Sequence, residues 1–120
     1  RFYTGDGTAK ALDDKTETID GVEYKTLGVK SVLKAQEKII AGGLLARYDW
    51  QVVRKAEKGT AMDSNVITYR DGIRTAYTTR KTEITNCADT AALVTLYGST
   101  QQSDKTWKPN MTQYPEDPNN

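Results

Sequence analysis

The side chains that could carry chemistry in this 120-residue chain are few and do not form a catalytic set. There is no histidine, and Cys87 is the single cysteine. A Cys–His pair cannot form, and the usual zinc ligand is missing. The adjacent Asp13 and Asp14 direct their carboxylates apart, which predicts a solvated loop instead of a metal site. Gly5-Asp6-Gly7 predicts a turn, because the lysine and helix of a phosphate-binding loop do not follow it.

Two further groups could contact a partner. Trp50 beside Asp49 could form a ligand platform, although a core tryptophan with a partner for its indole N–H is the expected role. A basic edge is expected on a later helix, formed by Arg70, Arg74 and Lys81. This edge could contact an acidic partner or nucleic acid, but the acidic residues beside it dilute the positive field.

The totals exclude several classes of protein. With 17 basic and 16 acidic residues the net charge is +1, so no long-range field would attract nucleic acid or an anionic membrane. No apolar run reaches membrane-spanning length. Hydrophobic residues make up 37% of the chain and charged residues 28%, which predicts one small domain with a lean core. Such a core favours a protein that completes its burial against copies of itself or a larger assembly.

The N-terminal half predicts a hairpin and then a helix. Residues 16–26 flank Asp20-Gly21, a strong hairpin signal. From residue 29 the apolar residues recur at helical spacing, and Gly42-Gly43 is expected to end that helix. Residues 44–58 fit a strand and a helix about equally.

The C-terminal half contains a second choice. Residues 65–84 could form a hairpin around Asp71-Gly72, but apolar residues in steps of three and four continue past it and favour one long helix. Residues 86–89 resemble a helix-capping box, and a short helical stripe follows. Residues 99–120 are polar and contain all three prolines, which predicts an extended tail held by a neighbour.

With these segments placed, the chain resembles small tail-associated and tail-fibre-assembly-chaperone-like proteins of tailed bacteriophages. The shared pattern covers roughly residues 17–98. It includes Leu44-Leu45, an Asp-Trp-x-Val-Val-Arg stretch (Asp49, Trp50, Val52, Val53 and Arg54), Gly59-Thr60-Ala61, and a Tyr-Arg-x-x-Ile-Arg stretch (Tyr69, Arg70, Ile73 and Arg74). A helix such as Asp89–Tyr97 and a late tryptophan complete the pattern, and the N-terminal ribbon at 19–24 also fits it. The resemblance implies that both ambiguous segments, 44–58 and 65–84, are helical. It carries no catalytic signature.

We therefore predict an α+β, mainly α protein, with an N-terminal hairpin at 16–26, three to four helices within a helical core at 29–98, and a C-terminal tail at 99–120. Residues 1–98 would form the single domain. The expected core comprises Val32, Leu33, Ile39, Leu44, Leu45, Trp50, Val52, Tyr69, Ile73 and Leu93. The expected partner-binding residues are Arg70, Arg74, Lys81, Trp107, Met111 and Tyr114.

The primary functional hypothesis is a non-enzymatic structural protein of a phage virion that contacts other virion proteins or copies of itself. We expect no catalytic residue, cofactor, metal, small-molecule substrate or membrane partner. The first alternative is a transient tail-fibre assembly chaperone. The second is a small nucleic-acid-binding regulator that uses Arg70, Arg74, Arg80 and Lys81.

Overall fold

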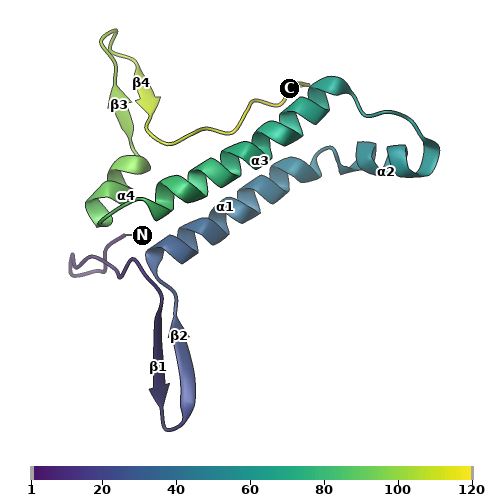
Figure 1. Cartoon of the computed structure of the whole chain (residues 1–120). Coiled ribbons are helices and arrows are strands. Elements are labelled where there is room, and N and C mark those ends of the chain that lie inside the picture. The colour runs from purple at the N-terminus through teal and green to yellow at the C-terminus, as the bar shows by residue number, and fades with distance from the viewer. Residues whose placement is uncertain (1, 120) are drawn as a thin grey trace.

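Two long antiparallel helices form the body of the molecule in the computed structural model, which describes residues 2–119 (Figure 1). They are α1 (Val29–Ala46) and α3 (Ser64–Thr85). Helix α2 (Asp49–Lys58) lies at one end of the pair, and α4 (Thr90–Leu96) lies at the other. Both segments that the sequence left open, 44–58 and 65–84, are thus helical where α2 and α3 cover them.

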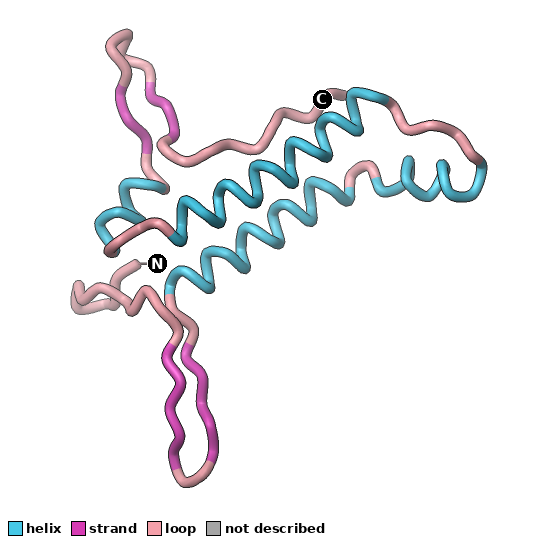
Figure 2. Tube along the Cα trace, in the orientation of Figure 1, coloured by secondary structure: helices cyan, strands magenta, loops and turns pink. Residues whose placement is uncertain are grey.

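Two hairpins project from the α4 end of the pair, on opposite sides (Figure 2). In the first, β1 (Lys15–Ile19) pairs with β2 (Val22–Thr26) around Asp20-Gly21. Both turn residues have positive φ, at 52° and 77°, as a two-residue hairpin turn with the correct twist requires. The mainly helical α+β class is confirmed, with this hairpin followed by four helices.

The second hairpin was not predicted. Strands β3 (Ser99–Gln101) and β4 (Trp107–Pro109) pair antiparallel within the segment that we expected to be extended. Its loop turns through Lys105 at φ 70°, and Asp104 accepts bonds from Thr106. The sequence signal was weak because this turn contains no glycine.

The remaining tail is a strap held by the chain's own helices. After β4 it runs back along α3 towards the start of that helix (Figure 1). The Asp117 carboxylate accepts hydrogen bonds from the Tyr48 hydroxyl and, at 3.4 Å, from Arg47. These contacts hold the tail against its own chain; the expectation that a neighbour also holds it stays a prediction.

The α1–α3 pair contains two apolar clusters. Near α4, the first cluster joins buried residues from α1, α3, the loop that follows α3, α4 and the tail: Val29, Leu33, Ile84, Cys87, Leu93 and Met111. Near α2, the second cluster contains Ala41, Tyr48, Val66, Tyr69 and Ile73, with Leu44 and Leu45 partly buried against it. Tyr48 and Tyr69 meet edge to face, with their ring centroids 5.9 Å apart. Each cluster is small, as the composition predicted.

Four of the expected core residues are exposed: Val32, Ile39, Trp50 and Val52. The apolar stripe of α1 is wider than its contact with α3, which takes the side that carries Leu33 and Ala41. Val32 and Ile39 therefore face away from α3. Helix α2 buries only Gln51, which bonds Asp63, and leaves Trp50 beneath the Arg54 guanidinium, 4.9 Å from the ring centroid.

Two helix boundaries also differ from those predicted. Helix α1 continues through Gly42 and Gly43 to Ala46, although each glycine costs about 1 kcal/mol relative to alanine in a helix. Among residues 2–119, a Cβ added at either glycine would meet no atom within 4 Å. Helix α4 is capped by Asp89, which accepts a bond from the Ala92 amide, while Asn86 ends α3.

The molecule is extended for its length. Its radius of gyration is 19.1 Å, whereas a compact chain of this length would have one of about 14 Å. Its accessible surface is 8214 Å², whereas a compact protein of 13.3 kDa exposes about 6,500 Å². The two hairpins account for much of this shape, since every residue of the four strands is exposed.

The N-terminal arm closes the start of α1. The Val29 and Lys30 amides donate to the Ala11 and Leu12 carbonyls, and the Gly28 amide donates to the Asp14 carboxylate. A Cβ at Gly28 would lie 2.3 Å from the Leu12 carbonyl oxygen, so only glycine fits this crossing.

We predict that Gly28→Ala lowers the free energy of unfolding by about 2–4 kcal/mol, because backbone must move to relieve the clash. Urea denaturation measures this. Gly5→Ala is the control, because a Cβ there meets nothing within 4 Å. Equal stability of the two variants would contradict the crossing geometry.

Candidate protein-interaction surfaces

The main buried polar group is an ion pair between the two long helices. Glu37 on α1 is 2% exposed and accepts two bonds from the Arg80 guanidinium on α3, at 2.7 and 2.8 Å. The pair lies between the two apolar clusters, since Leu33 and Ala41 flank Glu37 on α1. A two-bond guanidinium–carboxylate pair is the strongest form of this contact.

The same ion pair also holds α4 and the tail. The Tyr97 hydroxyl donates to Glu37 at 3.1 Å, and the Tyr114 hydroxyl donates to it at 2.9 Å. Arg80 donates to the Thr112 carbonyl at 2.6 Å and lies 4.8 Å from the centroid of the Tyr114 ring. Because these groups satisfy one another, the cluster clamps four segments together and offers no free acid or base.

The electrostatics of this clamp favour the charged pair. Burial alone would raise the pKa of Glu37, but the hydrogen bonds from Arg80 and Tyr114 outweigh it and lower the pKa below its ordinary value. Burial and the neighbouring Glu37 carboxylate raise the pKa of Tyr114, which keeps its hydroxyl protonated as a donor. The carboxylate and the phenol therefore stay in the states that the clamp requires.

The basic edge predicted from the sequence does not form as an exposed surface. Arg70 is buried; it donates to the Leu45 carbonyl and pairs with Asp49 at 3.1 Å, so its guanidinium is engaged within its own chain and not displayed on the surface. Arg74 is exposed and pairs with Asp71 at 3.3 Å. The Lys81 ammonium lies 4.2 Å from the centroid of the Tyr77 ring. These positions are divided between the interior and the surface.

The three tail residues expected to bind a partner differ in exposure. Met111 is buried in the first apolar cluster, and Tyr114 is partly buried against the second, so both anchor the tail to its own chain. Trp107 is 65% exposed on β4 and remains available. The sequence pattern could identify apolar anchors in the tail but not which surface they would contact.

Hairpin β1–β2 presents an apolar face that no other segment within residues 2–119 covers. Ile19 lies opposite Val22, and Glu17 lies opposite Tyr24, so the three large apolar side chains share one face. Each of them is more than half exposed. An isolated two-stranded hairpin is marginally stable, so a partner surface would stabilise this one.

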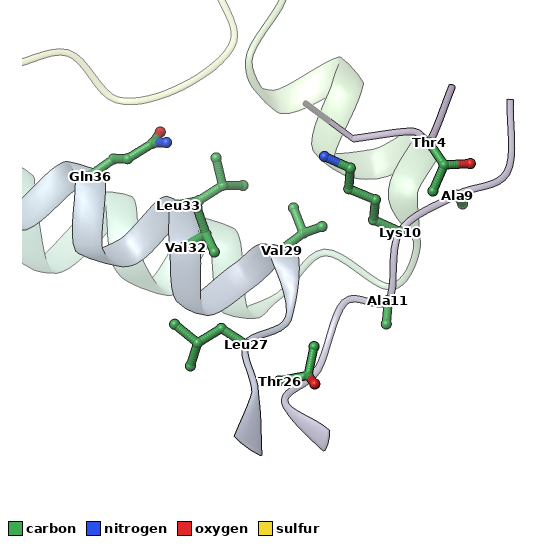
Figure 3. Close-up of a pocket in the computed structure, with 10 residues that line it drawn as sticks. All are labelled: Thr4, Ala9, Lys10, Ala11, Thr26, Leu27, Val29, Val32, Leu33 and Gln36. Atoms are coloured by element: carbon green, nitrogen blue, oxygen red, sulfur yellow. The ribbon is translucent and has the colours of Figure 1, made fainter. Parts of the chain in front are cut away.

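A groove lies where this hairpin joins α1. Its volume is about 480 Å³, and Leu27, Val29, Val32 and Leu33 line one side of it. The N-terminal arm supplies the other side through Thr4, Ala9, Lys10 and Ala11 (Figure 3). The groove was not foreseen, because residues far apart in the sequence form it. Its lining can bury apolar side chains, and Lys10 is the one charged residue among those that line it.

Potential metal ligands and Cys87 are the remaining candidates for chemistry. Among residues 2–119, no cluster of three or more potential metal-ligating side chains occurs. Cys87 is buried, and this burial raises the pKa of its thiol, which disfavours the reactive thiolate. Within that same range, no helix is long and apolar enough to cross a membrane.

Replacing Glu37 with leucine should destabilise the protein and release its tail. We expect a loss of about 3–5 kcal/mol in the free energy of unfolding, because Arg80 would stay buried without its partner. Limited proteolysis should then cleave after β4 at a higher rate. Arg74→Ala is the matched control; it breaks an exposed pair and should cost less than about 1 kcal/mol. Equal losses in both variants would contradict the clamp.

The lowered pKa of Glu37 also sets a pH dependence. A carboxylate with a depressed folded-state pKa stabilises the fold above its ordinary value of 4.5, and this contribution is lost as the pH falls through the folded value. Stability should therefore decrease below about pH 4.5. Glu37→Gln should reduce this decrease in parallel urea titrations. Identical dependence of stability on pH in wild type and Glu37→Gln would show that Glu37 does not cause this decrease.

Comparisons with known proteins do not extend this description. No protein-family model, curated protein or solved structure matches the chain.

Proposed function

We propose that this chain is a non-enzymatic structural component of a bacteriophage virion, associated with the tail or its fibres, that acts through protein–protein contacts. The observation that carries the protein-contact role is the pair of exposed hairpins at one end of the helical body. The virion context rests on the sequence resemblance across residues 17–98.

The exposed hairpins suit a connecting role. Ile19, Val22 and Tyr24 on one hairpin and Trp107 on the other present apolar surface away from the body. Aromatic side chains of this kind are enriched at the centres of protein interfaces. The clamp at Glu37 and Arg80 holds Tyr97 and the tail, which flank hairpin β3–β4. The bonds from Gly28 and Val29 to the N-terminal arm hold the base of hairpin β1–β2.

A transient tail-fibre assembly chaperone is the second candidate, and the groove between the N-terminal arm and α1 favours it. A volume of about 480 Å³ with an apolar side could hold a short apolar segment of a fibre protein during assembly. A nucleic-acid-binding regulator has less support, because Arg70 and Arg80 are engaged in ion pairs with Asp49 and Glu37.

Quantitative mass spectrometry of purified particles separates the two candidates. We expect the chain in mature virions at a fixed ratio to the tail proteins. Its absence, together with its presence in assembly intermediates, would contradict the structural role and support the chaperone.

Hairpin variants test the contact surface. Tyr24→Asp and Trp107→Ala should leave the fold intact, because both side chains are more than half exposed, yet lower the copy number in particles by about tenfold. Val94→Asp on α4, a similarly exposed site away from the strands, should assemble as wild type does. Normal incorporation of both hairpin variants would exclude the hairpins as the contact surface.

A further inference from the structure

The tail that follows β4 contacts the helices through every third residue. Met111, Tyr114 and Asp117 are buried or partly buried, whereas Gln113 and Glu116 between them are exposed. This segment lies wholly within the described residues and forms no helix or strand. Three residues per turn is the period of an extended polyproline-type chain. Short segments of this kind are recognised by surfaces that contact their inward side chains. The tail therefore lies on the helices as a peptide ligand would.

The helices present specific groups to this segment. The Glu37 carboxylate, which is 2% exposed, accepts a bond from the Tyr114 hydroxyl at 2.9 Å. The Glu83 carboxylate accepts a bond from the Thr112 amide at 3.1 Å. We call the surface beneath the tail the tail seat; it is formed on α1, on α3 and at the α1–α2 junction by Glu37, Tyr48, Gly72, Arg80 and Glu83.

Gly72 gives the tail seat its shape. This glycine lies inside the 22-residue helix α3, where it is less favourable than alanine. A Cβ at this position would lie 3.1 Å from Cγ of Pro115, which is closer than ordinary van der Waals contact. Gly42 on α1 shows the contrast, because a Cβ there would meet no atom within 4 Å among residues 2–119. Gly72 therefore leaves room for a proline ring at one position of the bound segment.

An empty tail seat would leave buried groups without their partners. Without the tail, Glu37 loses the bond from the Tyr114 hydroxyl. Arg80 loses the Thr112 carbonyl, to which it donates at 2.6 Å. The site of Met111 in the first apolar cluster would also open. Unpaired buried polar groups and vacated apolar sites are both costly. The tail seat therefore favours an occupied state, whichever chain supplies the segment.

We propose that the tail seat is a peptide-binding site that accepts residues 111–117 of a second copy of this chain when its own tail is displaced. This rests on the proposed role as an assembling protein and adds a contact surface to the hairpins. Because all of the contacts come from one short segment, a second copy can supply every one of them. The chain's own tail competes, since its covalent connection gives it an effective concentration on the order of millimolar. Exchange between copies is therefore favoured where copies are packed closely.

A peptide that is not connected to the chain tests the site. The acceptor is the full chain with Tyr114→Phe and Asp117→Ala, which weaken its own tail but keep the ion pair between the helices. By fluorescence anisotropy, a labelled peptide of residues 109–119 should bind the acceptor at least about tenfold more tightly than wild type, whose own tail competes. The same peptide with Tyr114→Ala should bind about tenfold more weakly. The peptide with Glu116→Ala should bind as the unmodified peptide does, because Glu116 is exposed.

A blocked tail seat supplies the matched control. In the acceptor, Gly72→Leu should weaken peptide binding by more than about tenfold, because the new side chain would occupy the space of Pro115. Gly42→Leu should leave peptide binding unchanged, and circular dichroism should show both variants folded. The full chain with Gly72→Leu alone keeps an intact tail without a seat for it. It should bind the acceptor more tightly than either variant binds itself, since only this mixture joins a free tail to a free seat.

Wild type tests the exchange without any substitution. Peptide at about millimolar concentration should displace the chain's own tail and raise the rate of cleavage after β4 in limited proteolysis. An unchanged rate, or the absence of peptide binding to the folded acceptor, would overturn the proposal. Equal binding by the Gly72→Leu and Gly42→Leu variants, or of a scrambled peptide, would also overturn it. A virion result decides none of these outcomes, because the measurements use the purified chain and a peptide.

Discussion

The ion pair between Glu37 and Arg80 is the contact on which the rest of the structure depends. It lies between two small apolar clusters that also join α1 to α3. A charge pair tolerates little displacement, so it fixes which turn of one helix faces which turn of the other. The hydroxyls of Tyr97 and Tyr114 complete it, which joins α4 and the tail to the same register.

The small number of contacts between the elements explains the open shape. The elements are held together mainly by the contact between α1 and α3. The two hairpins project away from this helix pair and do not pack over it (Figure 1). The contacts that fix the arrangement of the elements are buried, while some apolar side chains remain exposed to solvent. Ile39 on α1, Tyr24 on β2 and Trp107 on β4 are then available to other chains, whereas the residues that fix the geometry are not.

The fold class and most element positions could be predicted from local patterns. Asp20-Gly21 specified the first hairpin, and the apolar period identified α1 and α3. The predictions that were wrong were those that depended on contacts between elements. Whether Val32 or Leu33 would be buried depends on which side of α1 meets α3, and Arg70 looked like a surface cation because its partner, Asp49, lies on another helix. Met111 looked like an anchor for a neighbour because its actual site combines four segments. Local sequence propensity does not indicate which residues of different elements will contact each other.

We propose that this chain associates with copies of itself and does not persist as a free extended monomer, because its core is small and its hairpins expose apolar side chains. Small-angle X-ray scattering of the purified wild-type protein tests it most directly, because one measurement returns both mass and dimensions. We predict a scattering mass of at least twice 13.3 kDa, the mass of one chain. A species of 13.3 kDa with a radius of gyration near 19.1 Å at every concentration would contradict it.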